Sequence, residues 1–299
     1  MKKLLFFLSA VCFAALSCTK EKTDYEGAID SETPGHIAFK EATAIHSGGY
    51  YISIEALNGT FYKGYNEIRV KITNSSTSVK VDVAGVTFLP ITTDADGGTN
   101  SCPHRYDLAY KPDSNYFSGY SVFTSESGAD GTWALDIGFT VANQTYTATL
   151  PIVVQEQTNQ NLNMTAFTGK DDERYIIALV SPQRPKVAEN ELIAGIYRLN
   201  TLTPSRFSYT EVSGYTLMLD PRMPEPSMGN HSSPNNVDLT QQDDGLYRGV
   251  VNYTMTGNWT LNFIMLNEDG RILKGTEVPT DFTPGVEGVK SELYIDILF

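Results

Sequence analysis

Cysteine is almost absent from this chain of 299 residues, which contains three. Cys12 and Cys18 lie close to the amino terminus, so Cys102 has no partner in the remainder of the chain. Secreted scaffolds that depend on disulfides are much richer in cysteine. The sequence therefore excludes a disulfide framework, and stability must come from a buried core.

Basic residues are also scarce. The chain has 22 Lys and Arg against 35 Asp and Glu, which gives a formal net charge of -13. Proteins that bind nucleic acid present an excess of positive charge to the phosphate backbone. We therefore exclude nucleic acid as a partner.

Catalytic signatures are missing as well. The four histidines belong to no His-Glu-x-x-His motif, and the chain lacks a Gly-x-Ser-x-Gly nucleophile motif, a Walker loop and a dinucleotide-binding fingerprint. Paired carboxylates such as Asp243 and Asp244 stand in sequence that favours solvated turns. We expect a protein that is not an enzyme.

Long apolar runs are confined to the amino terminus. Met1-Lys2-Lys3 precedes an apolar stretch at 4–16 that is too short to cross a membrane, and Cys18 follows it. This arrangement resembles a bacterial lipoprotein signal at 1–17, with Cys18 as the lipidated first residue of the mature protein; an ordinary secretory signal is the alternative. We expect a cell-envelope protein held to the membrane by this lipid, on the periplasmic or surface face of the outer membrane.

The rest of the chain alternates short β-like segments with turn residues. Segments rich in β-branched and aromatic residues occur at Tyr50–Ala56, Glu67–Thr73, Ser78–Val83 and Thr145–Leu150. Many short strands without a long helical stripe are typical of an immunoglobulin-like β-sandwich.

The strand pattern also repeats. The matching segments are Tyr51–Leu57 with Tyr175–Ser181, Asn66–Ile68 with Asn190–Leu192, Val83–Leu89 with Val212–Met218, and Gly131–Leu135 with Gly257–Leu261. The spacing is far longer than the roughly 20–50 residues of a solenoid repeat, so it indicates a duplicated domain.

We therefore predict an all-β protein with two tandem immunoglobulin-like β-sandwich domains. The domain boundaries follow from the repeat: a flexible tether at 18–35, domain 1 at 36–155, a linker at 156–163 and domain 2 at 164–299. Trp133 and Trp259 occupy equivalent places, where we expect them to anchor the two cores.

Soft metal ligands gather between residues 218 and 234, a segment with four prolines. Methionine usually fills cores, but Met223, Met228 and His231 stand among Pro, Gly, Asn and Ser with no period that would bury them. Thioethers and imidazole together favour copper, and the prolines would hold the ligands close to their bound arrangement. We predict a copper site here; a loop packed over the core is the alternative. Met218 aligns with Leu89, which makes it either a core residue or a fourth ligand.

A second soft pair stands in the first copy. Cys102 aligns with His231, and His104 follows two residues later. A thiolate and an imidazole at this spacing suit a soft metal, whereas a buried free thiol beside a structural histidine is the alternative. We expect Met255, on a later strand, to be a core residue.

Residues 210–266 also resemble a known family. The likeness rests on Met223-x-x-x-x-Met228-x-x-His231, on Gly245-x-Tyr247-x-Gly249 and on Met255-x-Gly257-x-Trp259. These motifs resemble the FixH/YtkA-like family of small membrane-anchored β-sandwich domains of the bacterial envelope. The resemblance implies handling of copper or another cation, often in oxidase assembly, and hence a cuproprotein or metal-transport partner. This chain differs in having two copies and a lipid anchor in place of a transmembrane helix.

The sequence thus predicts an envelope lipoprotein that acts as a copper metallochaperone or sink. The alternative is a surface binding or adhesion module that recognises carbohydrate or protein. Its candidate contact residues are aromatic: Tyr106, Tyr110, Tyr116 and Phe117.

Overall fold

The computed structural model describes residues 38–157, 160–200 and 208–299. All regular secondary structure in these ranges is β-strand, which confirms the predicted all-β class. The described part contains no helix of the length and apolarity that a membrane crossing requires. The predicted signal peptide, Cys18 and the tether lie outside the described residues.

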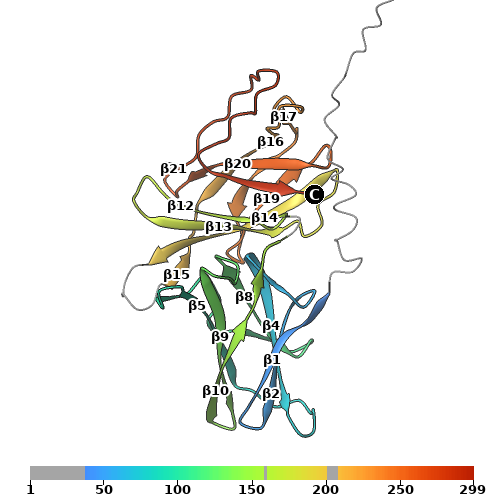
Figure 1. Cartoon of the computed structure of the whole chain (residues 1–299), viewed down its shortest axis with the longest axis vertical. Coiled ribbons are helices and arrows are strands. Elements are labelled where there is room, and N and C mark those ends of the chain that lie inside the picture. Colours follow the sequence, from blue (N-terminus) through green and yellow to red (C-terminus); the bar gives the residue numbers. More distant parts are fainter. Residues whose placement is uncertain (1–37, 158–159, 201–207) are drawn as a thin grey trace, which may run out of the picture.

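The first half of the chain forms two facing sheets, which occupy the lower part of Figure 1. One sheet has the strand order β1-β2-β4-β8-β7 and the other has the order β10-β9-β5-β6, while β3 and β11 form a separate parallel pair. The strand bounds are β1 Phe39–Ser47, β2 Tyr50–Leu57, β3 Phe61–Tyr62, β4 Gly64–Asn74, β5 Gly85–Asp94, β6 Thr99–Asn100, β7 Ala109–Lys111, β8 Tyr116–Phe123, β9 Gly131–Val141, β10 Gln144–Ile152 and β11 Val154–Gln155.

Alternation along the strands builds the core between these two sheets. On β4, Ile68, Val70 and Ile72 are buried, whereas Arg69 and Lys71 between them are partly exposed. The facing sheet contributes further buried side chains: Phe88, Trp133, Leu135, Ile137 and Phe139. Each such residue stabilises the fold by about 1.5–3 kcal/mol relative to an exposed one, so this core replaces the missing disulfides. The expected core position of Trp133 is confirmed.

The predicted strand at Ser78–Val83 is wrong. It makes only an isolated bridge, between Lys80 and Thr73. The segment carries the chain from β4 in one sheet to β5 in the other, and Ser78 takes a left-handed φ of 56° as the turn ends. Val81 and Val83 still pack against the edge of the core, which explains the apolar alternation.

The second half forms one sheet of eleven strands. Its main path is β12-β13-β14-β19-β18-β16-β20-β21, and β15, β17 and β22 pair with β14, β16 and β20. One core contains buried residues of β13 and β21, which lie at or next to the two ends of this path, so the sheet curls around it (Figure 1). The strand bounds are β12 Met164–Thr168, β13 Arg174–Ser181, β14 Glu189–Asn200, β15 Ser208–Glu211, β16 Thr216–Met223, β17 His231–Ser232, β18 Val237–Gln241, β19 Tyr247–Asn252, β20 Asn258–Leu266, β21 Ile272–Lys274 and β22 Tyr294–Leu298.

The two halves follow the same strand succession. The run β1-β2-β4-β8-β7 in the first corresponds to β12-β13-β14-β19-β18 in the second, and β9-β5-β6 corresponds to β20-β16-β17. Asn66 and Asn190, which the repeat aligns, even make the same hydrogen bonds. Each side-chain amide donates to the carbonyls two and four residues earlier and accepts from the backbone N–H four residues earlier.

A tyrosine-rich cluster joins the two halves. Val122 of β8 packs with Ile176 of β13 and Tyr197 of β14, and all three are buried. Tyr65 stacks on Tyr120 with ring centroids 5.4 Å apart, and Tyr120 lies 5.7 Å from Tyr197. The contacts of Val122 and Tyr120 with the second half cross between the halves, so the junction has an apolar core of its own.

The segment predicted as a linker forms hydrogen bonds with both halves of the chain. Gln157 donates from Nε2 to the carbonyl of Lys63 at 3.0 Å. Asn161 is buried and donates from Nδ2 to the carbonyl of Pro182 at 3.0 Å. The described parts of this segment therefore belong to the packed structure of both halves.

Candidate functional site

A short antiparallel ladder between β16 and β17 brings two of the predicted metal ligands together. Met223, the last residue of β16, pairs directly with His231, the first residue of β17. Side chains of directly opposed residues lie on the same face of a sheet, with Cβ atoms about 5 Å apart. The side chains of Met223 and His231 therefore project from adjacent positions on the inner face of the sheet.

Met223 reaches from this ladder into the core of the second half. Its side chain is 2% exposed and belongs to the same apolar cluster as Trp259 and Tyr253. A Cβ atom added at Gly257 would lie 2.9 Å from the Cε atom of Met223, so the terminal methyl group rests on that glycine. Gly257 also has a φ of 129°, which side-chain-bearing residues rarely adopt. The turn before β20 is thus shaped around Met223.

His231 lies at the rim of this core. Its Nε2 is 3.0 Å from the hydroxyl of Thr254, and its ring centroid is 6.2 Å from that of Trp259. A neutral imidazole that donates from Nε2 to the hydroxyl carries its lone pair on Nδ1, the atom then free for a metal. Thr254 is a residue that the sequence reasoning missed, because no motif marks a hydroxyl that approaches through the fold.

Met228 occupies the loop that connects the two strands. Its backbone N–H donates to the carbonyl of Glu225 at 2.9 Å, and its own carbonyl accepts from the N–H of His231 at 3.2 Å. Gly229 and Asn230 follow with φ values of 60° and 55°, the left-handed turn that returns the chain to β17. The side chain of Met228 packs, partly buried, against the same core as Met223.

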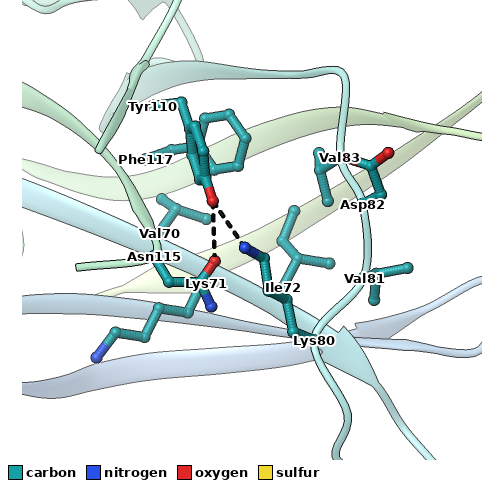
Figure 2. A pocket seen from close by; sticks show the side chains of 10 residues that line it. All are labelled: Val70, Lys71, Ile72, Lys80, Val81, Asp82, Val83, Tyr110, Asn115 and Phe117. Carbon is teal, nitrogen blue, oxygen red and sulfur yellow. Dashed lines mark hydrogen bonds between the residues drawn. The ribbon is translucent and has the colours of Figure 1, made fainter. Parts of the chain in front are cut away.

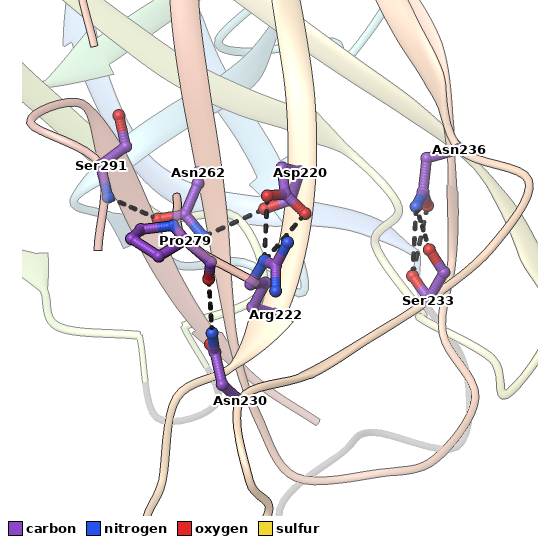
Figure 3. A network of polar contacts seen from close by, with 8 residues as sticks. All are labelled: Asp220, Arg222, Asn230, Ser233, Asn236, Asn262, Pro279 and Ser291. Carbon is purple, nitrogen blue, oxygen red and sulfur yellow. Dashed lines mark hydrogen bonds and ion pairs between the residues drawn. The ribbon is translucent and has the colours of Figure 1, made fainter. Parts of the chain in front are cut away.

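Polar contacts hold the base of this loop in place (Figure 3). Asn230 is buried and donates from Nδ2 to the carbonyl of Pro279 at 3.1 Å. On the adjoining strands, Arg222 forms an ion pair with Asp220 at 2.9 Å, and Asn262 donates to the carbonyl of Asp220 at 3.0 Å. Asn230 therefore ties the loop to the segment at Pro279, while Arg222 and Asn262 hold the strand from which the loop starts.

Met218 does not join the other three residues. It is 39% exposed and pairs with Ile264 on the outer face of the sheet. It stands five positions before Met223, and an odd spacing on a regular strand places two side chains on opposite faces, here about 16 Å apart along the strand. The expectation that Met218 is a core residue is wrong, and its face excludes it from a site with Met223.

Residues 169–263 match the YtkA-like family. The predicted resemblance is confirmed, and it extends from β13 through most of β20 rather than beginning near residue 210. The YtkA-like region includes Met223, Met228 and His231. No curated protein matches the chain.

Three solved structures are distantly similar to this chain. A DUF4785 family protein from Legionella pneumophila is 10% identical with a TM-score of 0.25, and the match covers 75% of this chain and 54% of that one. A conserved domain protein from Bacillus anthracis is 12% identical with a TM-score of 0.26, covering 87% and 90%. A chain described as pT26-6p is 10% identical with a TM-score of 0.24, covering 80% and 64%. This chain thus spans about half the length of the Legionella protein, and scores this low do not establish a shared fold.

The first half has a pair of residues at the positions equivalent to Met223 and His231. On β5, Thr92 pairs with Asn100 of β6 and lies opposite Trp133. In the YtkA-like region, the pair next to the tryptophan strand is Met223 and His231. The sequence alignment of Cys102 with His231 is therefore displaced by two residues, because the loop lengths differ. The equivalent pair in the first half, threonine and asparagine, contains no soft ligand.

Cys102 and His104 have structural partners. Cys102 is 1% exposed, its Sγ is 3.3 Å from the hydroxyl of Ser121, and burial raises the pKa of its thiol to about 12. His104 donates from Nδ1 to the carbonyl of Cys102 at 2.7 Å, and burial lowers the pKa of this imidazole. A metal would need the thiolate, which this environment disfavours. The geometry favours the alternative, a buried thiol beside a structural histidine.

Other predicted positions are settled by burial. Trp259 is fully buried, as expected, and its Nε1 donates to the carbonyl of Met255 at 3.0 Å. Met255 packs against the core of the YtkA-like region but stays partly exposed. In the described ranges, no three or more His, Cys, Asp or Glu side chains form a group that could hold a metal ion.

The aromatic residues proposed as a contact surface do not form a continuous row. Tyr106 and Tyr110 are 51% and 43% exposed, but Phe117 is buried in the core of the first half. The placement of Phe117 on an exposed platform is wrong, because β8 alternates and turns this ring inward. Tyr116 lies beneath the guanidinium of Arg69, which is 4.7 Å from its ring centroid.

Proposed function

We propose that the YtkA-like half of this protein captures a soft metal ion, copper, through Met223, Met228 and His231. The observation that carries the proposal is the direct pairing of Met223 with His231, with Met228 in the loop between them. Two thioethers and one imidazole suit Cu(I), which takes few ligands and prefers sulfur and imidazole nitrogen to carboxylates. Copper is the cargo of this site and takes part in no reaction there.

The surroundings support such a role. The thioether of Met223 lies in an apolar core, and the polar imidazole of His231 lies at its rim beside Thr254. Neutral thioethers require no deprotonation, so they remain ligands when the solution turns acidic. Met255 follows Thr254 and offers a further partly exposed thioether at the same rim. A site with one buried and several accessible donors suits an ion that must be released to a partner.

The function that follows is that of a non-enzymatic metallochaperone or copper sink of the cell envelope. In this proposal the lipid on Cys18 holds the protein to the membrane, and a cuproprotein or metal transporter receives the ion. Metabolic labelling with a fatty acid tests the anchor, because a Cys18→Ala variant should lose the label and leave the membrane fraction. Retention of the label in that variant would contradict this part of the proposal.

The first half supplies the matched variant for the metal site. Replacing Met223 and His231 with the residues found at the equivalent positions, Met223→Thr and His231→Asn, installs a pair that this fold already accommodates as Thr92 and Asn100. We expect the double variant to bind Cu(I) more than about 100-fold more weakly in competition with a chromogenic chelator. A Met218→Leu variant is the control and should bind like the parent protein.

Two results would contradict the proposal. One is a parent protein that takes no Cu(I) from the weakest chelator of the series. The other is a folded double variant that binds as tightly as the parent, with folding checked by circular dichroism. Trp259 gives a second readout, since its ring lies 6.2 Å from that of His231 and its fluorescence should fall as the ion binds.

Thr254 tests how the imidazole is held. A Thr254→Val variant keeps the shape of the side chain but leaves Nε2 of His231 without its hydroxyl partner. Outer-shell partners of this kind change metal affinity by about 10- to 100-fold. We expect a loss in that range, together with an altered pH dependence of binding. An unchanged pH profile would assign Thr254 a purely structural role.

A further inference from the structure

A small cavity opens at the edge of the first half, where the sandwich is incomplete. The pairing between β4 and β8 ends where Val70 pairs with Phe117. Further along the same edge of β4, the next contact is the bridge between Thr73 and Lys80. The gap between them is a cavity of about 120 Å³. It lies between the crossing segment that holds Lys80 and the turn between β7 and β8 (Figure 2).

The inner part of the cavity is apolar. Its lining includes Val70, Ile72 and Phe117, which belong to the core, and Val81 and Val83, which pack at the edge of the core. An apolar cavity of about 150 Å³ holds a benzene molecule, so this space fits one branched aliphatic or aromatic group. It excludes drug-sized ligands, whose pockets start at about 300 Å³. A sugar is also disfavoured, because its hydroxyls would find no partners on these walls.

The mouth of the cavity presents hydrogen-bond donors. Lys80 donates from Nζ to the hydroxyl of Tyr110 at 2.8 Å, and that hydroxyl donates to Oδ1 of Asn115 at 3.2 Å (Figure 2). This chain of bonds leaves two N–H groups on Lys80 and the Nδ2 amide of Asn115 available. Asp82, across the cavity, turns its carboxylate away from this group (Figure 2).

Lys80 also differs in its ion pairing from Lys71, the other lysine that lines the cavity. The neighbouring Lys71 is paired with Glu55, whereas none of the ion pairs within the described ranges involves Lys80. Its ammonium group lies 5.4 Å from the ring centroid of Tyr110, so it stays above the mouth. A cation with free donors over an apolar cavity is complementary to a ligand with one anionic, accepting end and one apolar end.

We propose that this cavity binds a small carboxylate that carries a branched aliphatic or aromatic group. The apolar group fills the space beside Phe117, and the carboxylate bridges Lys80 and Asn115. A free short-chain acid and the carboxyl-terminal residue of a peptide present the same chemistry. The site lies in the first half and is independent of the metal site of the second.

The test is an NMR titration of the full mature chain with 3-methylbutanoate. We expect millimolar binding that shifts the backbone amides of Ile72, Lys80 and Phe117. The neutral analogue 3-methylbutanamide and the Lys80→Met variant should each bind about fivefold more weakly, the effect of losing one exposed charge pair. Lys111→Met is the matched control, because Lys111 is exposed on the β7–β8 hairpin beside the cavity but does not line it, and it should bind like the parent.

Two further arms complete the experiment. A Val83→Phe variant fills the cavity and should abolish the shifts, with circular dichroism to check the fold. The tripeptide Gly-Gly-Val and its amidated form then separate the two sources, since a peptide terminus binds only with its carboxylate free. Absence of shifts at about 50 mM acid would overturn the proposal, because such an affinity is negligible. Equal binding of acid and amide would overturn it as well, and so would parent-like binding by Lys80→Met.

Discussion

Tyr120 of the first half donates a hydrogen bond of 2.7 Å to Oε1 of Glu211 in the second half. Burial and this bond raise the pKa of the Tyr120 hydroxyl, so the group stays protonated and donating. The bond closes the tyrosine cluster at the junction. The two halves are therefore joined by a hydrogen bond as well as by the apolar cluster around Val122.

A double-mutant cycle measures this link. We expect Tyr120→Phe to lower the free energy of unfolding by about 1 kcal/mol, the usual net value of one hydrogen bond. The same change in a Glu211→Ala background should cost much less, since the partner is already gone. Urea denaturation of the four proteins checks this prediction. Equal costs in both backgrounds would show that the bond contributes nothing to the junction.

Removing the hydroxyl group from two tyrosines of the second core should change the free energy of unfolding in opposite directions. Among the described residues, the hydroxyl of Tyr253 is buried without a hydrogen-bond partner, whereas that of Tyr247 donates to the carbonyl of Val212 at 2.9 Å. Tyr253→Phe should therefore raise the free energy of unfolding by up to about 1 kcal/mol, and Tyr247→Phe should lower it by about 1 kcal/mol. Thermal and urea unfolding provide the measurement. A loss of stability in Tyr253→Phe would show that its hydroxyl has a partner such as water.

Cys102 should resist thiol reagents in the folded protein. Its side chain is 1% exposed, and burial raises the pKa of the thiol to about 12, so the reactive thiolate is rare at pH 8. In a Cys18→Ala mature chain, we expect no labelling by a disulfide reagent until guanidinium unfolds the protein. Rapid labelling under native conditions would place the thiol at the surface and reopen the Cys102 and His104 metal site.

His104 should make stability depend on pH. Burial lowers the pKa of its imidazole in the folded protein, so the unfolded chain binds a proton that the folded one rejects. Stability is fully present above the unfolded value of about 6.5 and decreases as the pH falls from there to the folded pKa. A His104→Asn variant keeps an N–H donor for the carbonyl of Cys102 but has no such proton. It should lose less stability than the parent between pH 7.5 and 5, and an equal loss would contradict the assignment.

Local pattern was sufficient for much of the fold. Alternation predicts the strands at Tyr50–Ala56 and Thr145–Leu150 to within two residues of the observed β2 and β10. It fails at Ser78–Val83, where the same alternation reflects a crossing between sheets. Periodicity indicates which side of an extended segment is apolar. It does not indicate whether the segment is hydrogen-bonded to a neighbouring strand, because an unpaired segment at the edge of a core shows the same alternation.

The candidate site was predictable in composition but not in arrangement. The soft ligands Met223, Met228 and His231 are visible in sequence, whereas the register that opposes Met223 to His231 depends on the turn at Gly229 and Asn230. Met218 was misplaced because Leu89, with which it aligns, is itself only partly buried and lies on the opposite face of β5 from the core residue Phe88. Thr254 reaches His231 only through the packing of distant strands, so no local signal marks it.

The pairing of β11 with β3 also determines when the first half can finish folding during synthesis. Val154 is buried in the first core and pairs with Phe61, and Gln157 then bonds to Lys63. A chain that emerges from its amino end therefore cannot finish the first half until the segment joining the halves has itself emerged. A break placed just before Val154 would remove a piece of the first core rather than separate two finished units.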